Sequence, residues 1–311
     1  MREFHRPVLL SEAIALLEVK PGGVYLDATL GGGGHAAEVL KRIGPSGTLI
    51  GIDRDREAVE YSRKRLEGTA GRKILAEANF RDLRSILDMH GIADLDGAIF
   101  DLGVSSHQLD TARGFSVQRD EPLDMCMGTD ARSAAEIVNQ YPEVELARII
   151  RDYGEERFAR RIARSIVRRR AAQPIRTTGE LAEVVVSAIP PARRRQDIHP
   201  ATCSFMAIRI EANAELEAIE TAIPAAVDAL KVGGVLAAIS FHSLEDRLVK
   251  TILRRLSGRC ECPPRMPECR CGARKVVKVL TAKPVTPSAD EIETNPRSRS
   301  AKLRAAVKID C

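Results

Sequence analysis

The sequence predicts an α/β fold in which a Rossmann-like sheet carries an inserted helical domain. Residues 23–55 read as a strand, a glycine-rich loop, a helix and a second strand, the order of an opening βαβ unit. Two further apolar strands are predicted at 73–78 and 96–101. From about 109 to 208 helical periodicity replaces the strand pattern, and strands resume at 235–243.

The loop at 31–34 consists of four glycines. It lies between Asp27, at the end of the first strand, and a helix that begins near His35. Glycine lets a backbone approach a ligand closely, and the start of a helix offers free N–H groups. Asp53, at the tip of the second strand, suits the two hydroxyls of a ribose. These features predict a nucleotide site.

Asp27 indicates which nucleotide binds. A carboxylate directly before the loop would repel the pyrophosphate of a nicotinamide dinucleotide, but it would attract the ammonium of S-adenosylmethionine (SAM). In a dinucleotide fingerprint the glycines also follow the strand directly, whereas DATL intervenes here at 27–30. The alternative is a structural glycine turn with Asp27 as a helix cap. The position of Asp53 favours the SAM site.

The third and fourth strands add two side chains to the predicted site. Phe80 follows the third strand, and Asp101 ends the fourth. Ligands of open α/β sheets bind outside the carboxyl ends of the strands. We therefore expect Asp27, Asp53, Phe80 and Asp101 to converge on one crevice. Position alone suits Phe80 equally to an adenine contact and to the core.

The composition is that of a globular protein, with 44% hydrophobic residues among 311 and a net charge of +5. No apolar run is long enough to span a membrane, and the N-terminus lacks the apolar segment of a signal peptide. We therefore expect a cytoplasmic enzyme with no membrane partner. Trp is absent and aromatic residues make up 4%, so base stacking on aromatic rings is excluded as the main mode of nucleic-acid binding.

The predicted insert contains helices at 133–139, 144–153, 155–170 and 178–188. The helix at 155–170 is apolar on one side. Its other side carries arginines with no acid among them: Arg157, Arg160, Arg161, Arg164 and Arg168. A second arginine run occupies positions 193–195. Because solvated helix faces usually mix both signs of charge, this pattern favours a phosphate-binding surface over a solvated face.

After the insert, residues 205–223 predict one long amphipathic helix and 231–234 predict a turn. The fifth strand, at 235–243, ends in polar groups that include Ser240 and His242. A helix at 244–256 and a last strand at 300–309 complete the fold. We expect two sheet segments, at 1–108 and 209–311, around a substrate-recognition domain at 109–208.

Seven cysteines, an odd number, argue against a secreted disulfide framework. Four of them, Cys260, Cys262, Cys269 and Cys271, lie in the loop at 260–271 as two C-x-C pairs. Four thiolates can hold a structural zinc ion and leave no open position for a substrate. Because zinc pairs are more often C-x-x-C, a proline-rich loop with free thiols is an equal alternative.

With these motifs in place, the sequence closely resembles the MraW family of ribosomal RNA small subunit methyltransferases, and the resemblance covers essentially the whole chain. It rests on long and unusual blocks: HRPVLL (5–10), DATLGGGGH (27–35), GIDRD (51–55), DLGVSSHQLD (101–110), RGFS (113–116), PLDM (122–125), YGEERFA (153–159), HPAT (199–202), SFHSLEDR (240–247) and NPRSRSAKLR (295–304).

The resemblance implies a Rossmann-like SAM-methyltransferase sheet with an inserted helical domain. It implies SAM-dependent methylation of the exocyclic N4 of a cytidine in 16S rRNA, in the decoding centre at the P site. The implied partner is 16S rRNA or the small ribosomal subunit. Carried over position by position, the cofactor contacts are Gly33, Gly34, His35, Asp53, Phe80, Asp101 and Gln108.

Four positions depart from the family pattern. His107 stands where the family usually has Pro, Cys126 and Cys203 each replace an Arg, and Met206 replaces a Gln. None of them touches the glycine loop or Asp53. The departures therefore bear on RNA contacts more than on the cofactor or the reaction.

The implied target nitrogen is a poor nucleophile, because its lone pair is delocalised into the ring. Positioning it in line with the SAM methyl carbon supplies much of the acceleration, ~7–11 kcal/mol in favourable systems. A side chain that accepts an N4–H would assist. The candidates are Asp101, Ser105 or Ser106, and Ser240 or His242. For His242, helix capping is an equally good interpretation.

Two other functions remain open. One is a methyltransferase that acts on a protein or a small molecule, with the arginines merely solvated. The other is a non-enzymatic assembly factor that binds RNA and keeps SAM as a structural ligand. The sequence does not determine the oligomeric state, or whether the substrate is naked rRNA or an assembled subunit.

Overall fold

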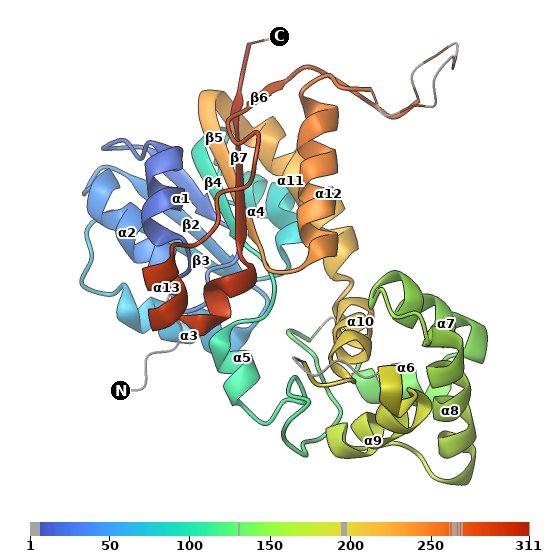
Figure 1. Ribbon diagram of the computed structural model, residues 1–311. Coiled ribbons are helices and arrows are strands. Elements are labelled where there is room, and N and C mark those ends of the chain that lie inside the picture. Colours follow the sequence, from blue (N-terminus) through green and yellow to red (C-terminus); the bar gives the residue numbers. More distant parts are fainter. Residues whose placement is uncertain are drawn as a thin grey trace. The chain divides into compact units, whose positions relative to one another are not determined.

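The computed structural model describes residues 7–310 apart from 130, 194–197, 261, 263–265, 267 and 269 (Figure 1). Its contacts divide the chain into two compact units. Unit 1 comprises Met1–Gly103 and Leu216–Cys311, and unit 2 comprises Val104–Glu215. These boundaries differ from those we expected, after 108 and 208, partly because α10 (Thr202–Asn213) packs against helices of unit 2.

Seven strands in the described part of unit 1 form one sheet, in the order β3-β2-β1-β4-β5-β7-β6. The first five are parallel, and β7 is antiparallel to both of its neighbours. The carboxyl ends of β1 to β5 therefore lie along one end of the sheet. The strands are β1 (Val24–Asp27), β2 (Thr48–Asp53), β3 (Arg72–Glu77), β4 (Leu95–Asp101), β5 (Leu230–Ser240), β6 (Val277–Val279) and β7 (Lys302–Lys308).

Helices cover both faces of this sheet, because successive strand residues point to opposite sides. Tyr25 and Leu49 join a core with α1 (Leu10–Leu17) and α2 (Gly34–Ile43). Their neighbours in sequence join a second core with three other helices, α4 (Leu83–Met89), α11 (Glu215–Ala229) and α12 (Ser243–Leu256). Unit 1 also contains α3 (Arg56–Arg65) and α13 (Ala289–Thr294). Within the described residues, no helix combines the length and the apolar character needed to cross a bilayer.

Three features of unit 1 differ from the sequence prediction: the start of β5, and the presence of β6 and α13. β5 begins at Leu230, because Leu230 pairs with Leu95 and Val235 pairs with Gly97. The expected turn at 231–234 is therefore a bulge within the strand. β6 and α13 were not predicted, because three and six residues are too short to show a period.

Unit 2 is helical, with its own apolar core. Its described helices are α5 (Ser106–Asp110), α6 (Ala134–Gln140), α7 (Glu143–Asp152), α8 (Ala159–Ala172), α9 (Thr178–Ala188) and α10. We expected α8 to begin at 155. It begins four residues later, because Glu155 adopts a left-handed conformation with φ of 49° that a helix cannot contain.

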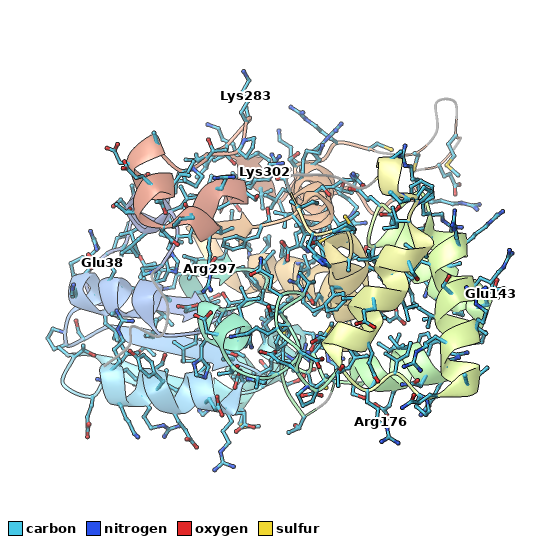
Figure 2. The ribbon with its side chains drawn as sticks, turned by 60° about the horizontal axis from the view of Figure 1, so that its bottom comes forward. Glu38, Glu143, Arg176, Lys283, Arg297 and Lys302 are labelled. Carbon is cyan, nitrogen blue, oxygen red and sulfur yellow. The ribbon has the colours of Figure 1, made fainter. Side chains whose placement is uncertain are left out.

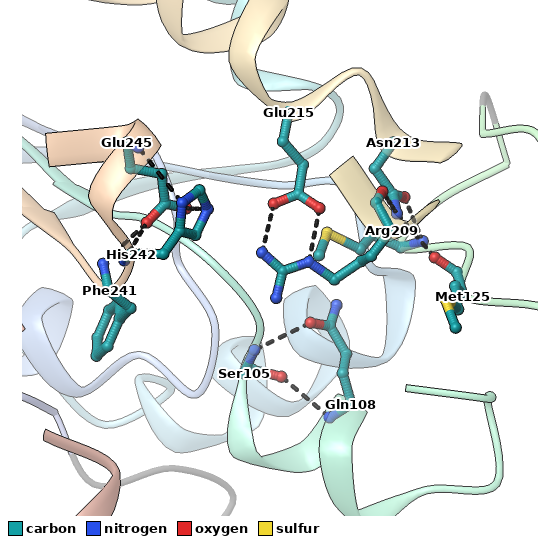
Figure 3. A network of polar contacts seen from close by, with 10 residues as sticks. Ser105, Gln108, Met125, Arg209, Asn213, Glu215, Phe241, His242 and Glu245 are labelled. Atoms are coloured by element: carbon teal, nitrogen blue, oxygen red, sulfur yellow. Dashed lines mark hydrogen bonds and ion pairs between the residues drawn. The ribbon is translucent and has the colours of Figure 1, made fainter. Parts of the chain in front are cut away.

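The long helix expected over 205–223 is in fact two helices. Ala214 adopts φ of 48°, which ends α10, and α11 starts at Glu215. Polar contacts brace this break (Figure 3). Asn213 donates to the carbonyl of Met125 at 2.8 Å and accepts from the N–H of Met127 at 2.9 Å. Arg209 forms two hydrogen bonds with the Glu215 carboxylate, at 2.8 and 2.9 Å.

Candidate cofactor site

Three carboxylates end adjacent parallel strands of unit 1, and we call them the carboxylate cluster: Asp27, Asp53 and Asp101. Asp27 pairs in register with Gly51 on β2 and with Ile99 on β4, each two residues before a cluster member. Asp27 is 2% exposed. Burial, together with the nearby charges of Asp101 and Asp53, raises its pKa from 3.8 to about 7. A positively charged ligand is therefore favoured at the cluster.

Asp53 holds the glycine loop in place. Its Oδ2 accepts the N–H of Gly31 at 2.8 Å, and its Oδ1 accepts the N–H of Asp55 at 2.8 Å. Burial raises its pKa to about 6, although these two N–H groups oppose the shift. Because a carboxylate has about four lone-pair sites, two stay available after these bonds. The side chain can therefore hold the loop and still accept from ligand hydroxyls.

The glycine loop is packed tightly on its protein side. A Cβ at Gly33 would lie 2.9 Å from Ser62 Oγ, and a Cβ at Gly34 would lie 2.9 to 3.0 Å from three carbons of Pro7. Gly33 also has φ of 69°. Glycine at these two positions is thus required by the fold itself, in addition to the access for a ligand that we inferred from sequence.

Two side chains of α3 fix the loop carbonyls, and sequence reasoning missed both. Ser62 donates to the carbonyl of Gly31 at 2.7 Å, and Arg65 donates to that of Gly32 at 2.7 Å. They lie one turn apart on a helix whose pattern predicts only a buried side, so no local signal distinguishes them. With the carbonyls held this way, the loop N–H groups keep a fixed direction.

His35 lies between the N-terminal segment and the carboxylate cluster. Its Nε2 is 3.1 Å from the carbonyl of Val8, and its Nδ1 is 3.7 Å from Asp101 Oδ2. Since a carbonyl only accepts, Nε2 carries a proton. Asp101 is also positioned through its backbone, because its N–H donates to Thr29 Oγ1 at 2.6 Å. His35 thus connects the HRPVLL block to the end of β4.

Phe80 follows β3 in a short 3-10 turn (Phe80–Asp82) and is half-buried. Its ring meets Phe100 edge-on at 5.8 Å between centroids, and it packs against the core. The side chain therefore has a core contact on one side and exposed area left for a ligand.

Ser105 and Gln108 belong to unit 2, where they cap α5 (Figure 3). Ser105 Oγ accepts the N–H of Gln108 at 3.2 Å, and Gln108 Oε1 accepts the N–H of Ser105 at 3.0 Å. This reciprocal pair is a capping box. The side chain of Ser106 lies outside the described residues. Because Ser105, Ser106 and Gln108 belong to unit 2, they are not part of the carboxylate cluster of unit 1.

Ser240 and His242 both have local partners at the end of β5. Ser240 is buried, and its Oγ donates to the carbonyl of Lys302 at 3.4 Å. His242 caps α12, where its Nδ1 accepts the N–H of Glu245 at 3.4 Å and its Nε2 lies 3.1 Å from Glu245 Oε1 (Figure 3). Glu245 in turn accepts the N–H of Phe241 at 2.8 Å. This geometry is that of a helix cap.

Three of the four loop cysteines lie together, and Cys269 is outside the described residues. The sulfurs of Cys260, Cys262 and Cys271 all lie within 4.8 Å of one another. The Cys260 and Cys271 sulfurs are 3.7 Å apart. A tetrahedral site with Zn–S bonds of ~2.3 Å has its sulfurs roughly 3.8 Å apart. The three described thiols therefore fit a zinc ion.

The arginine face of α8 is exposed, as the sequence suggested, but it does face acids from neighbouring helices. Arg164 lies 3.7 Å from Glu143, which projects from α7 (Figure 2). Arg160, Arg161 and Arg168 have no ion pair within the described residues. Of the second arginine run, Arg194 and Arg195 lie outside the described residues, as does the side chain of Arg193.

The sheet order, the antiparallel β7 and the glycine loop after β1 together define a Rossmann-like methyltransferase sheet with an inserted helical unit. Comparison with known proteins identifies the family. The model of the MraW methylase family matches residues 2–309. The chain belongs to this family, which confirms the resemblance inferred from sequence.

Curated relatives agree along nearly the full length. A protein named ribosomal RNA small subunit methyltransferase H from Heliobacterium modesticaldum is 49% identical over 308 residues, which is 98% of each chain. Proteins of the same name from Pelobacter propionicus and Heliobacterium mobile are 51% and 50% identical. These alignments cover 98% of both chains for the former, and 99% of this chain and 100% of the relative for the latter.

Proposed function

We propose that this protein is a SAM-dependent methyltransferase of small-subunit rRNA, and that it methylates N4 of the P-site cytidine of 16S rRNA. The observation that carries the proposal is the full-length match to a methylase family, with curated relatives that are named ribosomal RNA small subunit methyltransferases. Small subunits are assembled in the cytoplasm, so the proposal implies a cytoplasmic location.

The carboxylate cluster fits SAM. Asp27 is buried beside Asp53 and Asp101, and burial together with these neighbouring charges raises its pKa. SAM supplies an ammonium and a sulfonium, so its binding would offset the repulsion among these acids. The bound cofactor supplies a methyl carbon activated by the adjacent sulfonium.

Each remaining contact has a stated role in the proposal. Asp53 binds the ribose hydroxyls through its spare lone pairs, and the exposed side of Phe80 packs on the adenine. Gly33, Gly34 and His35 present the start of α2 to the cofactor. Asp101 and Gln108 complete the assignment carried over from the family.

Among the candidate proton acceptors, we favour Asp101. Ser240 already donates to Lys302, and the His242 ring caps α12. The Asp101 carboxylate accepts only, and the hydrogen bond from the Asp101 N–H to Thr29 fixes the end of β4. It can take a hydrogen bond from the target amine and so direct the nitrogen lone pair toward the methyl group. The target base must be unstacked to reach it.

The arginine face of α8 is the proposed rRNA contact of unit 2. Arg160, Arg161 and Arg168 are exposed and have no ion pair among the described residues, so phosphates can reach them without displacing an acid. The arginine run at 193–195 is proposed to contribute as well.

We further propose that the loop at 260–271 binds a structural zinc ion through Cys260, Cys262, Cys269 and Cys271. Two backbone N–H groups support thiolate character. The N–H of Cys262 donates to Cys260 Sγ at 3.4 Å, and the N–H of Arg270 donates to Cys262 Sγ at 3.3 Å. Such bonds stabilise negative sulfur. Metal analysis of the purified protein tests this: about one zinc per chain, lost in Cys271→Ser, is expected.

The function is tested by methyl transfer from labelled SAM to small subunits, free 16S rRNA and total protein, followed by nucleoside analysis. N4-methylcytidine in small-subunit RNA is expected, and Asp53→Asn should abolish it. Asp94→Asn, which changes an exposed aspartate of the same unit, is the matched control and should keep activity. Label in protein alone would replace the rRNA function with a protein-directed one.

A further inference from the structure

A groove of about 720 Å³ lies on unit 1, away from the residues assigned to the cofactor. Its lining residues come from α12, β6, the segment after each of them, and β7. These elements are labelled in Figure 1. Six of its lining residues are basic, and none of the lining residues is acidic: Lys250, Arg254, Arg259, Lys275, Lys278 and Arg304. We call this surface the basic groove.

Most of this positive charge is not neutralised by the protein. Arg304 is the buried exception, since its Nε donates to Asp246 Oδ1 at 2.6 Å. Lys250, Arg254, Arg259 and Lys278 are exposed, and none has an ion pair within the described residues. Four like charges are therefore gathered in one groove without an internal partner.

Some exposed arginines elsewhere in unit 1 are paired within their own helix. Arg42, Arg56 and Arg84 each reach an acid one turn away on their own helix, namely Glu38, Glu60 and Asp88. Lys250 and Arg254 are also four residues apart, but both are positive, which disfavours the helix. The negative end of the α12 dipole accounts for Arg254, in the last turn, but not for Lys250 or for Lys278 on β6.

The groove lies at the end of the sheet opposite to the carboxylate cluster. On β7, Lys302 pairs with Ser240 at the carboxyl end of β5, whereas Val307 pairs with Val235 near its other end. Val277, in the groove wall, pairs with Lys308 beyond that point. The groove thus lies mainly at the end of the strands away from the cofactor residues, and Arg304, which pairs with Ala238, is the lining residue of β7 that is nearest to them.

We propose that the basic groove binds backbone phosphates of the rRNA substrate, as an anchor remote from the reacting base. The inference rests on the proposed function. The groove has cations but no aromatic lining residue, so it suits phosphates, which position an RNA, rather than bases, which would specify a sequence. Because the anchor is remote, the substrate must be a folded RNA large enough to reach both ends of unit 1.

The test is the double variant Lys250→Glu with Arg254→Glu. Its matched control is Arg63→Glu with Lys64→Glu, which reverses two exposed cations at the end of α3 by the same charge. For the groove variant we expect about a tenfold higher KM for small subunits or 16S rRNA and an unchanged kcat. The plot of log affinity against log salt should become less steep by roughly 1.4, for two phosphate contacts at ~0.7 each.

SAM affinity, which should not change in either variant, shows that both fold. A groove variant that binds 16S rRNA as tightly as the control, with the same salt dependence, overturns the anchor even if methylation is intact. Equal losses in both variants also overturn it, because a general charge effect then suffices. If the wild type binds 16S rRNA but methylates no RNA, the proposed function fails, and the binding comparison still decides on the groove.

Discussion

The two ends of the unit 1 sheet carry opposite charges in opposite surroundings. At the carboxyl end, Asp27, Asp53 and Asp101 are withdrawn from solvent, and the pKa values of the first two are raised. At the other end, Lys250, Arg254, Arg259 and Lys278 of the basic groove are exposed and have no ion pair within the described residues. Buried charges interact strongly with one small ion and depend on pH, whereas exposed charges act additively and are screened by salt. The first arrangement suits a small cationic cofactor, and the second suits a polyanion.

The largest expected effect comes from removing charge at the buried end. Asp27→Asn should weaken SAM binding by about 100-fold, because the loss of one partner of a buried charge pair costs ~2–5 kcal/mol. Isothermal titration calorimetry measures it. Asp94→Asn is the control, since its side chain is exposed. SAM affinity within a few-fold of wild type would show that Asp27 faces no cation.

A packing change in the glycine loop tests whether the carboxyl end of the sheet depends on close packing as well as on charge. Gly34→Ala places a Cβ against Pro7, so we expect unfolding to become easier by about 1–3 kcal/mol. Thermal unfolding measures this. Gly68→Ala is the control, because no atom lies within 4 Å of its Cβ position and its φ is not positive. Equal stability of the two variants would mean that the loop shifts freely.

A second basic surface sharpens the comparison. Arg160→Glu with Arg161→Glu on α8 should weaken 16S rRNA binding by about tenfold and reduce its salt dependence. Filter binding at several salt concentrations measures both. The control is Arg56→Glu, because Arg56 is paired with Glu60. Unchanged binding would leave α8 as a solvated face.

An effect of similar size is a pH dependence of SAM affinity that only the buried end should show. Asp27 has a pKa of about 7 without ligand, and only its ionised form attracts an ammonium. SAM affinity should therefore rise roughly tenfold from pH 5.5 to 7. The rise should be absent in Asp27→Asn, and a parallel rise in both proteins would assign it to another group.

The same shift has a consequence for stability. Because the pKa of Asp27 is raised above 3.8, the folded chain holds a proton that the unfolded chain releases between about pH 4 and 7. Its contribution makes the unliganded protein less stable as pH rises through this range. The melting temperature of the wild type, measured relative to Asp27→Asn, should fall accordingly.

The sequence predicted those features that have a period or a strand-end position. The first five strands, the last strand and the loop before α2 were recognisable, because buried strands are apolar and their polar ends are abrupt. The antiparallel direction of β7 was not predicted. The break at Ala214 was not predictable, because an alanine gives no signal for a left-handed conformation. The roles of Ser62 and Arg65 also depend on tertiary contacts that no local pattern encodes.

Other features needed the structure because a motif has two uses. Ser105 and His242 were candidate catalytic groups in sequence, and the structure shows both as helix caps, with Gln108 and Glu245 as their partners. In sequence, Gly33 and Gly34 fit a loop that approaches a ligand closely. In the structure, glycine is also needed at these positions because a Cβ would meet Ser62 or Pro7. Sequence spacing alone therefore cannot decide whether such a residue caps a helix or fits a tight loop, or takes part in ligand binding or catalysis.

The strand order also constrains how the chain is made. β4 pairs with β5, yet the whole of unit 2 is synthesised between them. At ~5–20 residues per second, β4 must wait on the order of ten seconds with one edge unpaired after it leaves the ribosome. The N–H of Leu9 lacks its partner for still longer, because it donates to Glu291, which is near the other terminus. The nascent protein thus exposes an unpaired strand edge, which can pair with other chains, until translation is nearly complete. A chaperone that shields β4 would raise the folding yield of the protein.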